Sequence, residues 1–293
     1  MRVREFFSLL KSTIVQWSED GAPRLGAALA YYTLFSISPL LLIVIAGAGF
    51  LFGEDAVRGQ LIGTLQQLMG AELAKLLNGL ISATARPTAN KIASVIAIVV
   101  ILFGATGFFA QLRDALDTIW GVRQVRASGI LSTVWRYWWS LTMILGTGFL
   151  MMVSLLVSAA LNAAGNFAFV HIANAAVLLK GLHITIDLGV SALLFAMIFK
   201  FIPNVELPWK IALRGGLFTS VLFLIGETVL GIYLGRAGVA STYGAAGAVM
   251  MFLLWTYYSA QILLFGAEFT KLLAASVHAE VLPSTGYVIK KAA

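Results

Sequence analysis

Long runs of uncharged, apolar residues are the feature that most constrains how this chain folds. The first run extends from Gly26 to Gly53 without a single Asp, Glu, Lys or Arg. Only 11% of the 293 residues are charged and 60% are hydrophobic, whereas a soluble domain carries roughly 25% charged residues because its surface must face water. A chain this poor in charge cannot solvate most of its surface. We therefore predict an integral membrane protein.

Six segments are long and apolar enough to cross a bilayer as helices, at about 20 residues per crossing. These segments are 26–52, 92–112, 134–164, 179–202, 211–235 and 245–268. The predicted fold class is all-α, a polytopic membrane protein of six transmembrane helices with additional amphipathic interfacial helices. The first span is too long for the apolar core of a cleavable signal peptide, which has 7–15 residues.

The pattern divides the chain into three regions: a cytoplasmic amphipathic N-terminal segment (1–25), a six-helix transmembrane domain (26–272) and a cytoplasmic C-terminal tail (273–293). The apolar residues at helical spacing in the first region are Phe6, Phe7, Leu10, Ile14 and Trp17. Such a stripe is typical of a helix on the membrane surface, although a packed N-terminal helix has the same pattern. Segment 53–91 is also amphipathic, and we expect it on the outer side, either lying on the membrane or folded back as a lid.

The positive charges predict the orientation. The chain carries 20 Lys and Arg residues and a net charge of +7. If the six spans alternate in direction, most of these residues fall on the same side of the membrane as the N-terminus. Lys and Arg are enriched in cytoplasmic loops of membrane proteins. We therefore expect a multi-pass protein of a bacterial inner (cytoplasmic) membrane, with both termini in the cytoplasm and with membrane lipids, not nucleic acid, as its surroundings.

The sequence offers little to an enzyme. It has no cysteine, and its three histidines, His171, His183 and His278, have no metal-binding spacing. No G-x-S-x-G, P-loop or dinucleotide-binding fingerprint is present. We predict no catalytic residues, no metal and no cofactor.

Two carboxylates lie deep within predicted spans, Asp187 in the fourth and Glu227 in the fifth. Both are expected within roughly 5 Å of the midplane, at a rise of about 1.5 Å per residue. A charge there costs about 2.5–3.5 kcal/mol on insertion scales, so it must be paired, protonated or in contact with water. Helical spacing places Lys180, His183 and Ser191 on the same stripe as Asp187. One hypothesis is a polar pathway for an ion, a proton or a headgroup; the other is a structural contact between helices.

Pro39 interrupts the first span, where it cannot donate to the carbonyl of Phe35. Ser36 and Ser38 are placed to satisfy that carbonyl or to line a cavity. Broken helices near the midplane hold substrate in many transporters, but proline kinks also occur in purely structural helices. Glu268, at the end of the sixth span, is one turn from Lys271, and we expect an interfacial ion pair there.

Several segments in order along the chain resemble the YihY/BrkB family of bacterial inner-membrane proteins. These segments are Arg24–Tyr32, Ser38–Leu41, Phe103–Gly107, Leu112 with Ala115–Leu116 and Ile119–Trp120, Phe201–Asn204 with Trp209, and Tyr243–Gly244, Gly247, Leu254–Trp255, Tyr257 and Gly266–Glu268. The resemblance covers about residues 24 to 272. Asn204 and Glu268 fall on family motifs, and Asp117 stands where many members have asparagine. The resemblance implies six helices with both termini cytoplasmic.

The resemblance also guides the expected function. Members were once labelled ribonuclease BN, a name that this sequence does not support, and they are linked to serum resistance, solute or ion transport and envelope lipid export. We expect a transporter-like protein that moves, or assists the movement of, a lipid or other amphipathic envelope substrate. The alternatives are an ion-coupled small-solute transporter and a membrane scaffold that docks an envelope protein partner through 53–91. The oligomeric state is not indicated.

Overall fold

The computed structural model describes residues 3–69, 71–84, 107–125, 175–236, 239–284 and 286–289. The helices are α1 (Val3–Glu19), α2 (Ala22–Phe52), α3 (Glu54–Met69), α4 (Ala71–Thr84), an unlabelled helix over 107–119, α7 (Ala175–Phe201), α8 (Trp209–Arg236) and α9 (Val239–Ser276). The strands are β1 (Val122–Gln124), β2 (Val205–Glu206), β3 (Leu282–Pro283) and β4 (Tyr287–Ile289). They form two antiparallel pairs, β1 with β4 and β2 with β3.

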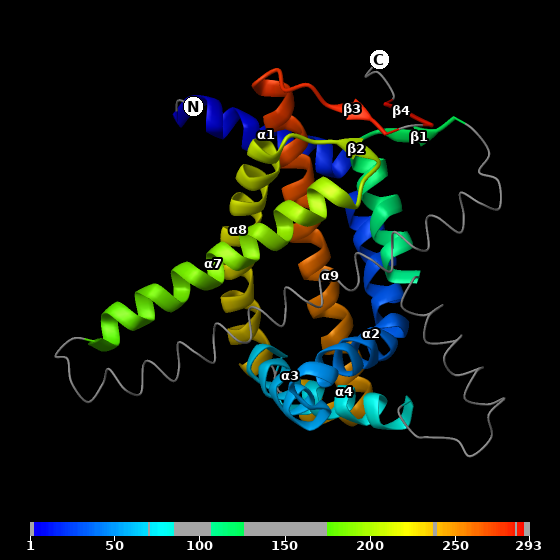
Figure 1. Ribbon diagram of the computed structural model, residues 1–293, viewed down its shortest axis with the longest axis vertical. Helices are drawn as coiled ribbons and strands as arrows, with labels where there is room; N and C mark the ends of the chain where they lie inside the picture. Colours follow the sequence, from blue (N-terminus) through cyan, green and yellow to red (C-terminus); the bar gives the residue numbers. More distant parts are fainter. Residues whose placement is uncertain are drawn as a thin grey trace.

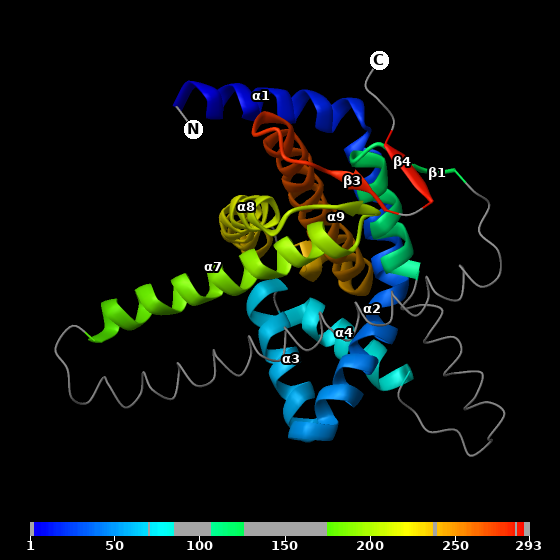
Figure 2. The ribbon, with the colours of Figure 1, turned by 45° about the horizontal axis from the view of Figure 1, so that its top comes forward.

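The long helices run between two ends of the molecule. Both chain termini and all four strands lie at one end, which we call the termini end, and α3 and α4 lie at the other (Figure 1). Helix α9 passes through the centre with α2 and α8 beside it, whereas α7 slants away from the bundle. Helix α1 lies across the termini end, above α9 (Figure 2). The main cluster of buried apolar side chains joins α2, 107–119, α7, α8 and α9.

Three of the described helices are long and apolar enough to cross a membrane, over Ile184–Phe201, Trp209–Leu230 and Val249–Ser276. They coincide with the predicted fourth, fifth and sixth spans, although α9 continues past the predicted end at 268. Helix α2 covers the predicted first span. The span 134–164 and most of 92–112 lie outside the described residues, so the total of six remains a prediction.

The N-terminal amphipathic segment forms α1, and the predicted stripe is packed in part. Leu9 is buried against Phe269 and Leu273 of α9, and Phe6 and Leu10 of the stripe pack on the same cluster, as Trp17 does on the main core. Phe7 and Ile14 are 64% and 57% exposed. Gly21, in the left-handed conformation at φ 69°, turns the chain from α1 into α2. One face of α1 is therefore packed, and a second apolar face is uncovered, so both alternatives for this segment describe part of it.

Segment 53–91 begins as a helical hairpin, α3 and α4, at the far end of α2. Val57 and Leu61 of α3 and Ile81 of α4 are buried against Leu41 and Ile45 of α2. The two helices are linked by the Arg58 guanidinium, which donates to the Asn78 side-chain oxygen and the Ser82 hydroxyl. The charged and apolar residues of this segment thus separate onto two faces, as the amphipathic pattern predicts.

Glycines allow α8 to pack closely against both α9 and α7. A Cβ at Gly215 would overlap Thr270 of α9, and a Cβ at Gly266 of α9 would overlap Thr219 of α8. Each threonine hydroxyl bonds back within its own helix, Thr219 to the Gly215 carbonyl at 2.8 Å and Thr270 to the Gly266 carbonyl at 2.6 Å. Since the helices are antiparallel, each threonine fills the notch left by the other helix's glycine. Such small residues let helix backbones approach closely.

The neighbouring Gly216 faces α7 instead, and its surroundings predict a sensitive position. An added Cβ would meet the carbonyl oxygen of Ala192 and, at 2.7 Å, the backbone nitrogen of Ala196. Backbone atoms cannot rotate aside, so Gly216→Ala should force α7 and α8 apart and destabilise the protein by about 1–3 kcal/mol. Thermal unfolding in detergent measures the effect.

Gly189→Ala is the matched control, because nothing lies within 4 Å of a Cβ built at Gly189 of α7. It should leave the unfolding temperature unchanged or slightly raised, since alanine favours helix. Equal unfolding temperatures for the two variants would contradict the close packing of α7 on α8.

Candidate functional site

The two predicted intramembrane acids lie on neighbouring helices, Asp187 on α7 and Glu227 on α8. Asp187 and Glu227 are both half-buried, and their carboxyls are close enough to interact electrostatically. Helix α7 packs on α8 through Gly216, which lies against Ala192 and Ala196. Much of the exposed surface of α8 is apolar, at Leu217, Val221, Leu224, Ile225 and Val229, although Lys210, Arg214 and Thr228 are exposed as well. The two acids therefore form one polar locus beside an apolar outer face.

The other residues of the predicted pathway do not join this pair in the described part of the chain. Ser36 of α2 is buried at 2% exposure, near Gly107 of the helix 107–119. Ser38 and Pro39 lie within α2 and His183 within α7, but their side chains are outside the described residues. The pathway thus remains a hypothesis that rests on Asp187 and Glu227.

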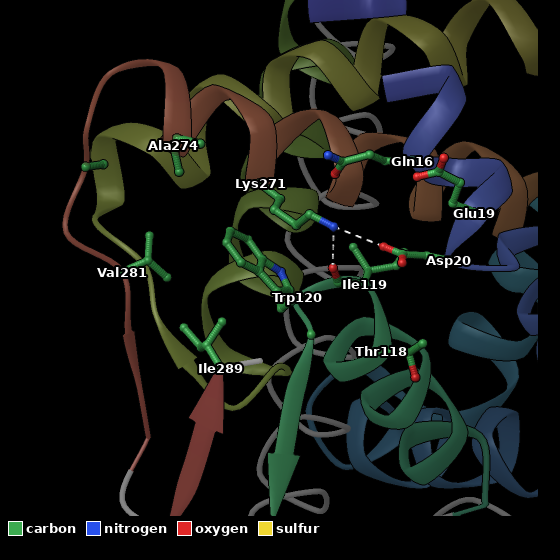
Figure 3. A pocket seen from close by; sticks show the side chains of 13 residues that line it. Gln16, Glu19, Asp20, Thr118, Ile119, Trp120, Lys271, Ala274, Val281 and Ile289 are labelled. Atoms are coloured by element: carbon green, nitrogen blue, oxygen red, sulfur yellow. Dashed lines mark hydrogen bonds and ion pairs between the residues drawn. The ribbon is translucent and has the colours of Figure 1, made fainter. Parts of the chain in front are cut away.

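A second polar cluster lies at the termini end, centred on the Lys271 ammonium (Figure 3). Lys271 Nζ donates to Asp20 Oδ2 at 3.0 Å and to the carbonyl oxygen of Ile119 at 2.7 Å. It also lies 2.9 Å from Glu268 Oε2, so the predicted pair between Glu268 and Lys271 is present. One ammonium thereby joins α9 to the α1–α2 turn and to the end of the helix 107–119.

Glu268 is the most deeply buried acid of this cluster, with 0% of its side chain exposed. Its Oε1 has no hydrogen-bond partner among the described residues, and its Oε2 meets the ammonium of Lys271, which is its counter-charge. The carboxyl of Asp20 also lies close enough to interact with it. The sequence pattern did not single out Asp20, because it is 251 residues from Lys271. Its position directly before the Gly21 turn is the only local signal.

A third set of contacts fastens the turn between α7 and α8. Asp117 Oδ1 accepts the backbone N–H of Asn204 at 2.7 Å, and Asp117 Oδ2 accepts the Asn204 side-chain amide at 2.6 Å. Arg113 donates from Nε to the carbonyl oxygen of Ile202 at 3.1 Å. The Asn204 carbonyl in turn accepts the N–H of Ser284 beside β3. Asn204, which falls on a family motif, is therefore a structural clamp for this turn.

Burial raises the pKa of the Asp117 carboxyl above its usual value. The hydrogen bonds from Asn204 and the charge of Arg113 lower that pKa, and the charge of Asp114 raises it, but desolvation is the largest effect. The clamp thus holds a carboxyl that is partly desolvated.

An open pocket of about 580 Å³ adjoins the Lys271 cluster. Its polar walls are Gln16, Glu19, Asp20, Thr118, Trp120 and Lys271, and its apolar walls are Ile119, Ala274, Ala275, Ala279, Val281 and Ile289, with Gly121 between them. Within the described ranges no group of three His, Cys, Asp or Glu residues could hold a metal ion. The pocket is instead suited to an organic group with polar and apolar parts.

The Lys271 cluster predicts a large effect for Lys271→Met, which removes the counter-charge but keeps much of the side-chain volume. Removing one partner of a buried ion pair leaves an uncompensated charge, so we expect a loss of about 3 kcal/mol. Unfolding in detergent measures this loss. The double variant Glu268→Gln with Lys271→Met should recover most of it, and the exposed Lys210→Met should change little. A single variant as stable as the double would contradict the pairing.

The clamp predicts a dependence on pH. A carboxyl whose pKa is raised in the folded state stabilises the fold most below its unfolded pKa of about 3.8, and this contribution is lost as the pH rises through the folded pKa. Asp117→Asn cannot ionise, so wild type should lose stability relative to this variant as the pH rises above about 3.8. Paired thermal unfolding curves across that range test it. A stability difference that stays constant with pH would refute the raised pKa.

Comparisons with known proteins agree with these features. The chain is 30% identical over 283 residues to a UPF0761 membrane protein of Methylibium petroleiphilum, covering 90% of this chain and 65% of that protein. It is 27% identical to one of Teredinibacter turnerae and 29% identical to one of Azotobacter vinelandii, covering 92% and 88% of this chain and 61% of each relative. The chain thus spans less than two thirds of the length of these relatives. No solved structure gives a significant match.

The relatives are named as membrane proteins, in keeping with the apolar helices α7, α8 and α9. Residues 13–284 match the sequence model of the family described as Virulence factor BrkB. That match includes every described helix from α2 to α9 and both clusters at the termini end. The chain is therefore a helical membrane protein that belongs to the BrkB family.

Proposed function

We propose that this protein is a transporter-like component of a bacterial inner membrane that moves, or assists the movement of, a lipid or other amphipathic envelope substrate. The observation that carries the proposal is the pairing of Asp187 and Glu227 on facing helices. Two interacting acids in helices of membrane-spanning character are costly unless they meet a polar partner, water, a proton or a polar group of a substrate, and the last of these is the role proposed here. Such a locus would bind a polar headgroup transiently while the headgroup crosses the hydrocarbon core.

The depth of the pair supports this role. Asp187 lies 14 residues before the end of α7 at Phe201, and Glu227 lies 18 residues after the start of α8 at Trp209. At about 1.5 Å per residue, the two acids are roughly 21 and 27 Å from the termini end of their helices. A hydrocarbon core is about 30 Å thick. With both termini in the cytoplasm, the pair would lie in the outer half of the bilayer, about 6 and 12 Å from the midplane rather than within the 5 Å expected from the sequence.

The outer surface of α8 supports a lipid rather than a small solute as substrate. Its exposed side chains near Glu227 are Leu224, Ile225 and Val229, which are suited to acyl chains. A headgroup at the two acids could therefore keep its tails in the membrane while it moves. A small hydrophilic solute would need an enclosed aqueous route instead.

The pair predicts the effect of neutral substitutions on transport. Purified protein in liposomes should accelerate the exchange of labelled phospholipid between leaflets, and Asp187→Asn or Glu227→Gln should reduce that rate roughly tenfold, as expected for loss of about 1.4 kcal/mol of stabilisation in the crossing state. Both variants should elute like wild type. Glu206→Gln, on an exposed residue of β2, is the matched control.

A parallel measurement of solute uptake driven by a pH gradient separates the rival functions. Uptake that depends on both acids, without lipid exchange, would favour an ion-coupled transporter. Unchanged behaviour of both variants, combined with loss of function on removal of 53–91, would favour the scaffold that docks an envelope partner.

A further inference from the structure

The pocket at the termini end contains polar atoms that the protein itself leaves unsatisfied. The indole N–H of Trp120 and the side-chain oxygen of Gln16 are buried without a hydrogen-bond partner among the described residues, and both residues line the pocket. Trp120 is only 5% exposed. An unsatisfied buried donor or acceptor costs about 1–3 kcal/mol. One donor and one acceptor in the same pocket therefore point to an occupant that carries both a hydrogen-bond acceptor and a donor.

The charges around the pocket indicate whether the hydrogen-bond donor of the occupant is cationic or neutral. The acids that face it are Glu19 and Asp20, with Glu268 directly behind Lys271. Lys271 is the cation that lines the pocket, and its ammonium already contacts Asp20, Glu268 and the Ile119 carbonyl. An ammonium has three protons to donate, so Lys271 has none left for an anion. The local balance is negative, which favours a cationic group near Gln16.

We propose that this pocket binds the headgroup of a zwitterionic phospholipid with a primary ammonium, the chemistry of phosphatidylethanolamine. The ammonium donates to the Gln16 oxygen and lies beside the carboxylates of Glu19 and Asp20. The phosphate accepts the Trp120 indole N–H. This inference rests on the proposed function in taking a lipid as substrate, and it deepens that proposal by naming the headgroup.

The apolar side of the pocket suits the rest of such a lipid. Figure 3 shows Val281 and Ile289 beside Trp120, opposite Gln16 and Glu19. Ala274 and Ala275 at the end of α9 continue this apolar wall. Polar atoms and apolar walls thus face the two parts of one amphipathic molecule.

Headgroup chemistry gives the proposal a selectivity. The quaternary ammonium of phosphatidylcholine has no N–H, so it leaves the Gln16 oxygen unsatisfied. Phosphatidylglycerol carries a net negative charge toward Glu19 and Asp20. Free phosphoethanolamine has the same polar chemistry but none of the apolar contacts. These three compounds therefore separate the ammonium donor, the charge and the acyl chains as contributors.

The test is a binding measurement on the purified full chain in detergent, with dioctanoyl phosphatidylethanolamine as the probe. We expect it to bind roughly tenfold more tightly than dioctanoyl phosphatidylcholine, in line with one charge-assisted hydrogen bond. Dioctanoyl phosphatidylglycerol and phosphoethanolamine should bind more weakly still. Equal affinity for the ethanolamine and choline lipids would overturn the proposed headgroup. Phosphoethanolamine binding as tightly as the lipid would overturn the assignment to a lipid.

Variants connect the binding to the pocket. Gln16→Leu and Trp120→Phe should each weaken binding of the ethanolamine lipid several-fold, and Gln16→Glu, which keeps an acceptor and adds charge, should preserve it. Trp17→Phe is the matched control, because Trp17 also has a buried indole N–H without a partner but does not line the pocket. Unfolding temperatures without lipid show whether each variant folds. If Trp17→Phe weakens binding as much as Trp120→Phe, the pocket is not the site.

The outcome is independent of the transport measurement. Selective binding that Gln16→Leu abolishes, in a protein without lipid exchange activity, would leave this site standing and remove the proposed transport. Lipid exchange that depends on Asp187 and Glu227 but shows no headgroup selectivity at the pocket would remove this inference and leave transport standing.

Discussion

The arrangement of the termini end depends on one ammonium group. Lys271 holds together its own helix through Glu268, the α1–α2 turn through Asp20 and the end of the helix 107–119 through a backbone carbonyl. A buried carboxyl needs a partner of opposite charge or a bound proton. Glu268 has no exposed surface, and its contact with Lys271 lies where the three segments meet. The pocket and the Asp117–Asn204 clamp both lie on the scaffold that results.

The protein therefore has two polar regions in an otherwise apolar bundle. The region at the termini end is built from complementary charges and fixed backbone bonds. The pair of Asp187 and Glu227 is built from like charges on helices packed through small residues. Complementary contacts stabilise one geometry, whereas two acids near each other raise each other's cost of ionisation. The two polar regions of this BrkB family member therefore differ in their electrostatics.

Much of the helical pattern was predictable, because apolar length and helical spacing follow directly from lipid as the solvent. The ends of α7 and α8 and the pair of Glu268 with Lys271 agree with the sequence, since they depend on neighbours one turn apart or on a proline after the span. Three features were not predictable from the sequence: the role of Asp20, the clamp of Asp117 on Asn204, and the unpartnered polar atoms of Gln16 and Trp120. Each depends on residues distant in sequence that only the packing of the helices brings together. The stripe of large side chains located the packed face of α1 in part: Phe6, Leu10 and Trp17 pack on the core as the spacing suggests, whereas Phe7 and Ile14 are exposed.

The glycine and threonine notches of α8 and α9 have a mechanical consequence. Each helix contributes one threonine and one glycine to this contact, in opposite order along the antiparallel pair. Translation of one helix along the common axis would therefore push both threonines against helix backbone. The two helices therefore keep one fixed register. Helix α7 is joined to this pair by the close contact of Gly216 with Ala192 and Ala196, so α7, α8 and α9 form one rigid block that carries both Asp187 and Glu227.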